Sequence, residues 1–160
     1  MDGRISYRLL AAPMSVEETG IGPAICLTVR QVDIVQKEEL ARRIAEITGY
    51  EFTDLDLLGS AFTHASSVDQ RLNSNERLEF LGDAVLAMVV CEEVFHRYPH
   101  YLEGQLTKIK SAVVSRRTCA HIARRIGLVE LLRVGKGMCS LESLPSSLAA
   151  AVLEAIIAAI

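Results

Sequence analysis

The sequence predicts an all-α fold, and three observations support this prediction. Half of the 160 residues are hydrophobic and only 23% are charged, so the chain can bury a sizeable core. Apolar residues recur at helical spacing in one segment after another. β-branched residues fall inside these helical periods, and no Asn-Gly or Asp-Gly pair joins two alternating runs as a hairpin would.

The first elements follow from the positions of glycine and proline. Residues 1–30 contain both at scattered positions without a sustained period, so we interpret them as an N-terminal extension with no assigned function. A helix is expected from Lys37 to Thr48, where apolar residues keep helical spacing, and Gly49 is expected to end it. A second, short helix is expected from Leu55 to Thr63.

The third predicted helix starts at about Asn75, with its N-cap among residues 73–75. It is expected to end at His96 or Arg97, before Pro99, because proline disfavours helical geometry in the residue that precedes it.

Three further helices are expected in the remaining part of the chain. One starts at Glu103, and another covers residues 116–126 and is stopped by Gly127. Residues 135–137 mark a loop, and a serine at 146 or 147 is expected to cap the last segment, SLAAAVLEAIIAAI. This segment is too short to span a membrane, which takes about 20 residues, so we expect a buried helix.

The third predicted helix gathers carboxylates on one face. At about 100° per residue, Glu76, Glu79 and Asp83 fall within an arc of roughly 60°. These like charges repel one another, and a divalent cation would compensate for that repulsion. The opposite, aliphatic face is expected to pack in the core: Leu78, Leu81, Val85, Met88 and Val89.

A simpler interpretation covers only part of this pattern. Glu76 and Glu79 are ordinary in a first helical turn, where acids favour the helix dipole. Asp83 lies in the third turn and follows Gly82, and an interior glycine costs about 1 kcal/mol relative to alanine. The glycine therefore suggests that another group approaches the backbone closely there.

A further acidic residue, Glu154, lies in an otherwise apolar segment near the end of the sequence. Glu154 is the only charge between Leu148 and Ile160, and burying an unpaired carboxylate costs several kcal/mol or shifts its pKa sharply. Its partner is expected to be either a metal ion or a buried arginine.

The net charge of −3 argues against a uniformly basic nucleic-acid binder, but the charge is unevenly distributed. Between Gly104 and Gly137, Glu130 is the single acid among eight basic residues, which predicts a phosphate-binding surface: Lys108, Lys110, Arg116, Arg117, Arg124, Arg125, Arg133 and Lys136.

The spacing of the cysteines and the composition of the N-terminus predict the compartment in which the protein is found. The four cysteines have no paired CxxC spacing, and the N-terminus carries Asp2 and no apolar segment typical of secretion. Reduced thiols, a cytoplasmic location and no membrane association are expected.

The segment Asn75 to Leu86, NERLEFLGDAVL, resembles the signature motif of the ribonuclease III family, endonucleases that cut double-stranded RNA. The similarity covers Lys37 to Ile160 and implies the helical bundle of the endonuclease domain of bacterial members. Other segments agree with the family in order and spacing: Thr63-His64-x-Ser66, Glu103-Gly104-x-Leu106-Thr107, Gly135-Lys136-Gly137 and Glu154-Ala155.

The resemblance implies roles for the acidic residues. Glu79, Asp83 and Glu154 would be ligands of Mg²⁺, with Mn²⁺ as a substitute, and Glu76 a further catalytic acid beside the scissile phosphate. Magnesium prefers oxygen ligands and keeps several waters, one of which can attack phosphorus. The family leaves 5′-phosphate and 3′-hydroxyl ends and acts in the processing of ribosomal and other RNA.

The resemblance also implies partners. Phe80 matches the aromatic residue that the family uses in its homodimer interface, whereas a lone aromatic is more often part of a core. Lys108, Lys110, Arg116 and Arg117 are the first candidates for contacts to double-stranded RNA, which proteins recognise mainly through shape, phosphates and 2′-hydroxyls. His64 is expected to be a structural hydrogen-bonding residue.

One position departs from the family pattern. Ala151 stands three residues before Glu154, where the family usually has a metal-binding aspartate. Either the site tolerates this change, or the chain is a weakened or inactive relative that still binds double-stranded RNA. The four remaining acids favour an active enzyme. A carboxylate-bridged di-iron bundle is a rival from another class, but it needs two Glu-x-x-His motifs, and the chain has one, at Glu93 and His96.

The resemblance finally bears on domain organisation. Residues 37–160 are expected to form the catalytic domain, and bacterial relatives usually continue into a separate RNA-binding domain, which the sequence does not contain. The apolar pattern is still running at Ile160, so we interpret the catalytic domain as truncated there.

Overall fold

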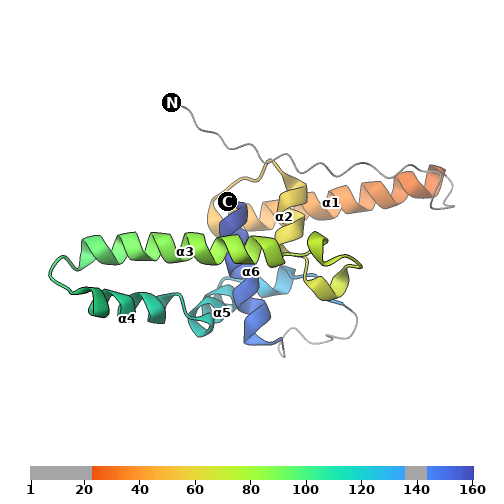
Figure 1. Ribbon diagram of the computed structural model, residues 1–160. Coiled ribbons are helices and arrows are strands. Elements are labelled where there is room, and N and C mark those ends of the chain that lie inside the picture. The colour runs from red at the N-terminus through yellow and green to blue at the C-terminus, as the bar shows by residue number, and fades with distance from the viewer. Residues whose placement is uncertain (1–22, 136–143) are drawn as a thin grey trace. The chain divides into compact units, whose positions relative to one another are not determined.

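The computed structural model describes residues 23–135 and 144–160, with side chains from residue 33 onward. The described residues are predominantly helical, which confirms the predicted all-α class, and their only β-type pairing is an isolated bridge between Thr63 and Arg133. The chain divides into two compact units, residues 1–35 and residues 36–160, and the helices that build the candidate site belong to the second (Figure 1). None of the described helices is long and apolar enough to cross a bilayer.

Helix α1, Pro23–Thr48, begins well before the predicted start at Lys37. Residues 23–30 of the expected N-terminal extension therefore belong to this helix. Proline fits the first turn of a helix, and no glycine or proline interrupts the chain between Pro23 and Gly49. The predicted stop is confirmed, since Gly49 has a φ of 72°, and its N–H donates to the Ala45 carbonyl at 2.8 Å.

Helix α2, Leu55–Ala61, is capped by Asp54, whose carboxylate accepts from the N–H groups of residues 56 and 57 at 3.1 and 2.9 Å. It ends two residues before the predicted Thr63, because the chain turns there to pair with Arg133. The Arg133 N–H donates to the Phe62 carbonyl at 2.8 Å. Two short 3₁₀ helices follow, η2 at Ala65–Ser67 and η3 at Arg71–Asn73.

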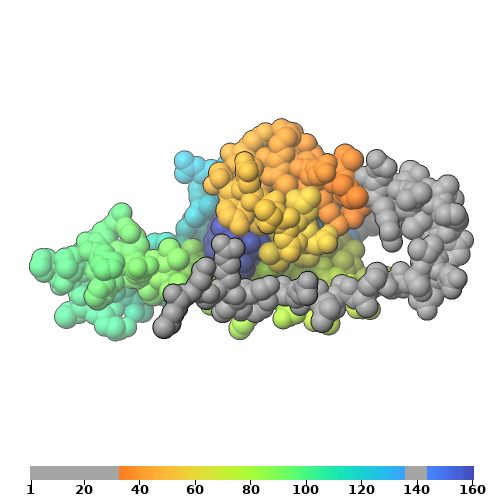
Figure 2. Space-filling view, turned by 90° about the horizontal axis from the view of Figure 1, so that it is seen from above, coloured from red at the N-terminus to blue at the C-terminus, as the bar shows by residue number. Residues whose placement is uncertain are grey.

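Helices α3, Glu76–Arg97, and α4, Glu103–Val113, lie side by side and are joined by a short turn. In the view of Figure 2 this turn projects away from the residues of α2. Asn75 occupies the N-cap position of α3, but its side chain makes no capping hydrogen bond and is 99% buried. The start and end of α3 otherwise agree with the prediction.

The last helices are α5, Arg116–Arg125, and α6, Ser146–Ala159, with the 3₁₀ helix η4, Val129–Leu131, between them. The predicted stop after α5 is confirmed by Gly127, which has a φ of 77°. The predicted serine cap of α6 is wrong: Pro145 holds that position, and both serines lie in the first turn. Residues 136 and 137 of the predicted loop lie outside the described residues.

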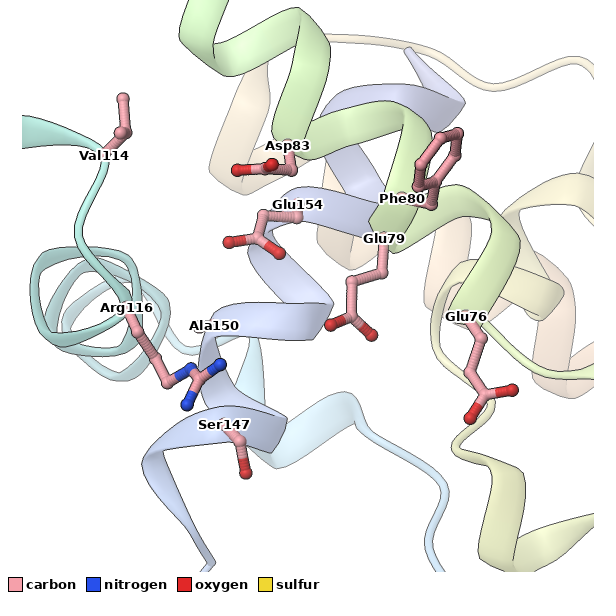
Figure 3. Close-up of a pocket in the computed structure, with 9 residues that line it drawn as sticks. All are labelled: Glu76, Glu79, Phe80, Asp83, Val114, Arg116, Ser147, Ala150 and Glu154. Carbon is pink, nitrogen blue, oxygen red and sulfur yellow. The ribbon is translucent and has the colours of Figure 1, made fainter. Parts of the chain in front are cut away.

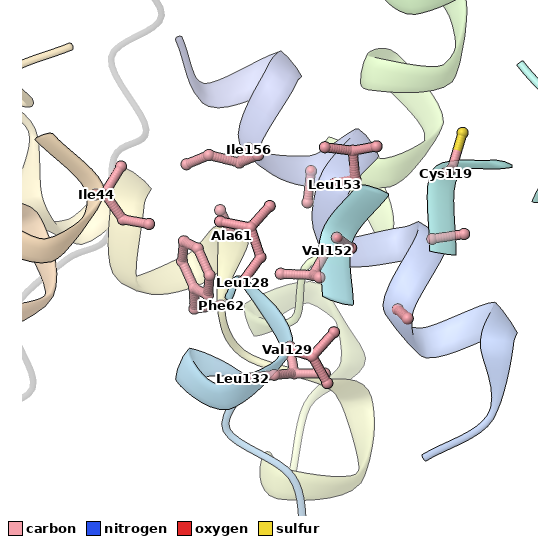
Figure 4. Close-up of a cluster of buried hydrophobic side chains, with 14 of the residues drawn as sticks. Ile44, Ala61, Phe62, Cys119, Leu128, Val129, Leu132, Val152, Leu153 and Ile156 are labelled. Carbon is pink, nitrogen blue, oxygen red and sulfur yellow. The ribbon is translucent and has the colours of Figure 1, made fainter. Parts of the chain in front are cut away.

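Helix α6 runs through the core (Figure 4). Its buried residues pack with Leu58 and Phe62 from the α2 region, Cys119 from α5, and Leu128 beyond it. This burial agrees with the expectation of an apolar, buried last helix.

Helix α3 crosses α6 at Gly82. A Cβ atom at this position would lie only 1.7 Å from the Glu154 carbonyl oxygen, so no larger residue fits unless the helices separate. The close approach that the sequence predicted at Gly82 is therefore confirmed, and it sets the distance between the two helices.

The prediction for the aliphatic face of α3 is partly wrong. Leu78 packs against the core, but Leu81, Met88 and Val89 are 47%, 65% and 51% exposed. Helix α3 contacts α6 and α4, and the described chain covers these three side chains only in part.

Candidate active site

The crossing of α3 and α6 forms one side of a cleft, and the start of α5 forms the other (Figure 3). The cleft has a volume of about 550 Å³. The residues that line it come from three helices and the turn before α5: Glu76, Glu79, Phe80, Asp83, Val114, Arg116, Ser147, Ala150 and Glu154.

Three carboxylates converge in this cleft. Glu79 and Asp83 are one helical turn apart on α3, and Glu154 reaches the same space from α6 (Figure 3). The backbone contact at Gly82 brings the two helices together beside them. The sequence placed Glu79 and Asp83 on one face, and the fold adds Glu154 to them.

The electrostatics of the cleft disfavour three negative charges. Burial, followed by repulsion from Asp83 and Glu79, raises the pKa of Glu154 to about 7. Burial also raises the pKa of Glu79, with repulsion from Glu76 as the next cause. Arg116 acts in the opposite direction on both groups. A bound cation would relieve this repulsion.

Glu76 lies in the same cleft in a different environment. Its carboxylate is directed away from the other three in Figure 3 and forms an ion pair with Arg71. The hydrogen bond from Arg71 lowers the pKa of Glu76, so Glu76 is held in its charged form.

The donor set fits magnesium in its chemistry. In the conformation described, no three His, Cys, Asp or Glu side chains of residues 33–135 and 144–160 are placed to hold one metal ion together. Magnesium nevertheless prefers carboxylate oxygens and keeps several of its waters, so it needs only one or two direct protein ligands. Glu79, Asp83 and Glu154 supply that type of ligand. The sequence also left a buried arginine as a possible partner of Glu154. Among the described ion pairs, no arginine lies within 4.0 Å of its carboxylate.

Ala151 supplies neither a ligand nor a wall of the cleft. Its side chain is 94% buried, and the surface next to Glu154 on α6 is formed by Ala150 and Ser147. The departure from the family pattern therefore leaves α6 with a single carboxylate.

Only one of the four basic residues predicted to contact RNA lines the cleft. Arg116 lines the cleft opposite the carboxylates, whereas Lys108, Lys110 and Arg117 lie outside the lining residues. Phe80 stands at the edge of the cleft and is 81% exposed.

His64 lies outside the cleft and makes structural hydrogen bonds. Its Nδ1 atom accepts from the Ser66 N–H at 3.1 Å and lies 2.8 Å from the Ser66 hydroxyl oxygen. That oxygen accepts in turn from the Gly135 N–H at 2.9 Å. These bonds tie residues 64–66 to the strand-like segment at 133–135.

Sequence reasoning missed several residues of the site. Ser147 has a helical signal, because it lies seven residues before Glu154 and so shares its face of α6. Arg71 has none, since it precedes α3 in a 3₁₀ turn whose geometry no periodicity predicts. Val114 lies between helices and likewise follows no periodic pattern.

The fold and the cleft together define the class of this chain: an all-α domain with the acidic cleft typical of a metal-dependent nuclease domain. The chain belongs to the ribonuclease-III-like family, whose model matches residues 54–160. The resemblance seen in the sequence is confirmed.

Relatives of known sequence and structure agree with this assignment. Ribonuclease 3 of Rhodopirellula baltica is 54% identical over 138 residues, which are 82% of this chain and 52% of that protein. Ribonuclease 3 of Anaplasma marginale (strain Florida) is 46% identical over 127 residues, 78% of this chain and 54% of that protein. The chain thus spans about half the length of these curated relatives.

Two solved structures of the ribonuclease III nuclease domain from Campylobacter jejuni are also similar. Both are 37% identical in sequence, with TM-scores of 0.69 and 0.68. They cover 73% and 74% of this chain, which in turn covers 81% and 80% of theirs. The first is described as showing structural flexibility in a region involved in dimer formation.

Proposed function

We propose that this protein is a Mg²⁺-dependent endoribonuclease that hydrolyses double-stranded RNA and leaves 5′-phosphate and 3′-hydroxyl ends. The convergence of Glu79, Asp83 and Glu154 in one cleft carries this proposal. Family membership supports the nuclease class and, with it, a role in the processing of ribosomal and other RNA in the cytoplasm.

In this proposal, Glu79, Asp83 and Glu154 would hold the metal, one or two of them directly and the rest through its bound waters, with Mn²⁺ as a substitute for Mg²⁺. An ion held by these residues would supply a bound water of lowered pKa as the nucleophile and would stabilise negative charge on the phosphate. Arg116, on the opposite wall, donates hydrogen bonds to a phosphate oxygen and fixes the backbone in the cleft. Glu76 lies at the edge of the cleft as a further acid near the scissile phosphate.

The RNA duplex extends beyond the cleft over a basic surface. Lys108 and Arg117 are exposed, and Lys110 is partly exposed, on the helices next to Arg116. These cations contact phosphates of the duplex and give binding its salt dependence.

The protein acts as a homodimer that α3 helps to form. Phe80 is the most exposed large apolar side chain among the described residues, and Leu81, Met88 and Val89 are also exposed on this helix. An apolar surface of this kind marks an interface. Two copies would bring two acidic clefts to one duplex, each cutting one strand.

A second candidate function is binding without cleavage. Ala151 favours it, because α6 brings one carboxylate to the cleft where the family usually has two. If Ala151→Asp raises both Mg²⁺ affinity and the cleavage rate, this weakened-site alternative gains support, whereas no change in either excludes it.

The deciding experiment incubates the purified protein with a fully paired RNA duplex and Mg²⁺, then maps the cut positions on both strands. We expect staggered cuts with 5′-phosphate ends in Mg²⁺ and none in EDTA or with Asp83→Asn. Duplex binding without cuts would favour the second candidate, and neither binding nor cuts would contradict the proposal.

A further inference from the structure

Arg71 forms an ion pair with Glu76, one of the four acidic residues of the cleft. Its Nε donates to Glu76 Oε2 at 3.1 Å, and its Nη2 donates to the other carboxylate oxygen, so the pair is bidentate. Sequence periodicity gave no role to Arg71, and the proposed chemistry does not use it.

The backbone of Arg71 is fixed relative to α3. Both the N–H and the hydroxyl of Ser74 donate to the Arg71 carbonyl, at 3.0 and 2.6 Å. Ser74 is almost fully buried and lies two residues before Glu76. The guanidinium is therefore presented to Glu76 by a short, anchored turn.

The ion pair gives Glu76 a different charge environment from that of its neighbours. Arg71 lowers the pKa of Glu76, whereas burial and mutual repulsion raise the pKa of Glu79 and Glu154. Figure 3 shows Glu76 directed away from those two residues and from Asp83. An unpaired Glu76 would add negative charge to a cleft that must admit a phosphate, and its carboxylate would be free to turn toward the other three.

We infer that Arg71 is a positioning residue for Glu76: its bidentate ion pair balances the charge of this carboxylate and holds it at the edge of the cleft, apart from the three acids proposed to hold the metal. The inference rests on the proposed function, since it assigns the pair to the place where the RNA backbone enters. The side chain of Arg71 is 77% exposed and that of Glu76 38%, so the pair contributes little to folding stability, and its loss is expected to act on the site.

The test measures two affinities for Arg71→Ala, Glu76→Gln and the double variant. One is the affinity for duplex RNA with Ca²⁺ in place of Mg²⁺, and the other is the affinity for Mn²⁺ alone, by calorimetry. We expect Arg71→Ala to weaken RNA binding about threefold and to tighten Mn²⁺ binding. In the Glu76→Gln background, the same substitution should change neither affinity by more than about 1.5-fold. Arg71→Lys should restore RNA binding in part, because a lysine pairs without the bidentate geometry.

Arg42→Ala is the matched control. Arg42 is also an exposed arginine paired with glutamates, Glu39 and Glu46, but it lies on α1 and does not line the cleft. Its loss changes the net charge equally and should leave both affinities unchanged.

Two results would overturn the inference. Equal weakening of RNA binding in the wild-type and Glu76→Gln backgrounds would show that Arg71 contacts RNA itself, and unchanged affinities in Arg71→Ala would show no role at the site. If the wild-type protein does not bind duplex RNA, the proposed function fails, and the Mn²⁺ isotherms alone still decide whether Arg71 acts through Glu76.

Discussion

Glu154 is a carboxylate in a partly buried position, where burial disfavours its charged form. It comes from the most apolar of the described helices, yet its carboxylate faces Glu79 and Asp83. Burial and these two charges raise its pKa to about 7, so negative charge on Glu154 costs folding free energy in the metal-free protein. A residue that we propose as a metal ligand is thus one that weakens the unliganded fold.

This cost predicts a pH dependence of stability. Because the pKa of Glu154 is about 7 in the folded protein against 4.5 as its ordinary value, the folded state binds more protons between these pH values. The midpoint of thermal unfolding in EDTA should therefore fall as the pH rises from 5 to 8. In Glu154→Gln it should fall less, and Mg²⁺ at pH 8 should raise it in the wild type. An equal fall in both proteins would contradict the assignment.

At the residue scale, the sequence predicts side chains that share a helix and misses those brought together by turns. Glu76, Glu79 and Asp83 could be placed on one face because a helix has a fixed angular step. The ion pair of Arg71 with Glu76 could not be predicted, because it depends on the path of a 3₁₀ turn. Glu154 could be singled out as an isolated charge, but its partners depend on how α6 crosses α3.

At the element scale, that crossing depends on Gly82. The Cβ of Gly82→Ala would meet the Glu154 carbonyl at 1.7 Å, so the helices must move apart. We expect a loss of at least about 2 kcal/mol in the free energy of unfolding, despite the higher helix propensity of alanine, together with weaker Mn²⁺ binding. Urea denaturation measures the first effect and calorimetry the second.

Gly104→Ala provides the control for helix propensity. Gly104 lies in α4, and a Cβ there has no atom within 4 Å, so this substitution should stabilise the protein slightly and leave Mn²⁺ binding unchanged. Equal effects of the two substitutions would contradict a special role for the crossing.

Helix ends were predicted best where glycine or proline sets them. Gly49 and Gly127 end their helices with positive φ, as expected, and α3 ends before Pro99. The start of α1 could not be predicted, because apolar and polar residues alternate there without a clear helical period. The one helical signal is Pro23, since proline is tolerated in the first turn of a helix. The two 3₁₀ turns before α3 have no periodicity that could predict them.

At the scale of the whole molecule, the aliphatic face of α3 is the main difference from the sequence prediction. Periodicity shows that such a face must be covered, but not whether the same chain or a second copy covers it. Leu81, Met88 and Val89 are exposed here, next to the helix face that carries Phe80. The proposed homodimer would account for both observations.

Phe80→Ala should therefore weaken the dimer by about 30-fold or more, as expected for an aromatic anchor at the centre of an interface. Sedimentation equilibrium over a range of concentrations measures this change. Leu72→Ala removes a side chain that is 73% exposed but lies in η3, outside α3, and should leave the dimer unchanged. A Phe80→Ala protein with wild-type dimer affinity would remove Phe80 from the interface.

The most direct test of the metal-dependent cleft is the single-turnover rate of duplex RNA cleavage as a function of Mg²⁺ concentration, in the wild type and in Glu154→Gln. We predict a rate that saturates with Mg²⁺ in the wild type. In the variant, half-saturation should require at least about tenfold more Mg²⁺, and the maximal rate should fall, because α6 then brings no carboxylate to the cleft. Identical Mg²⁺ dependence in the two proteins would contradict the placement of the catalytic metal between α3 and α6.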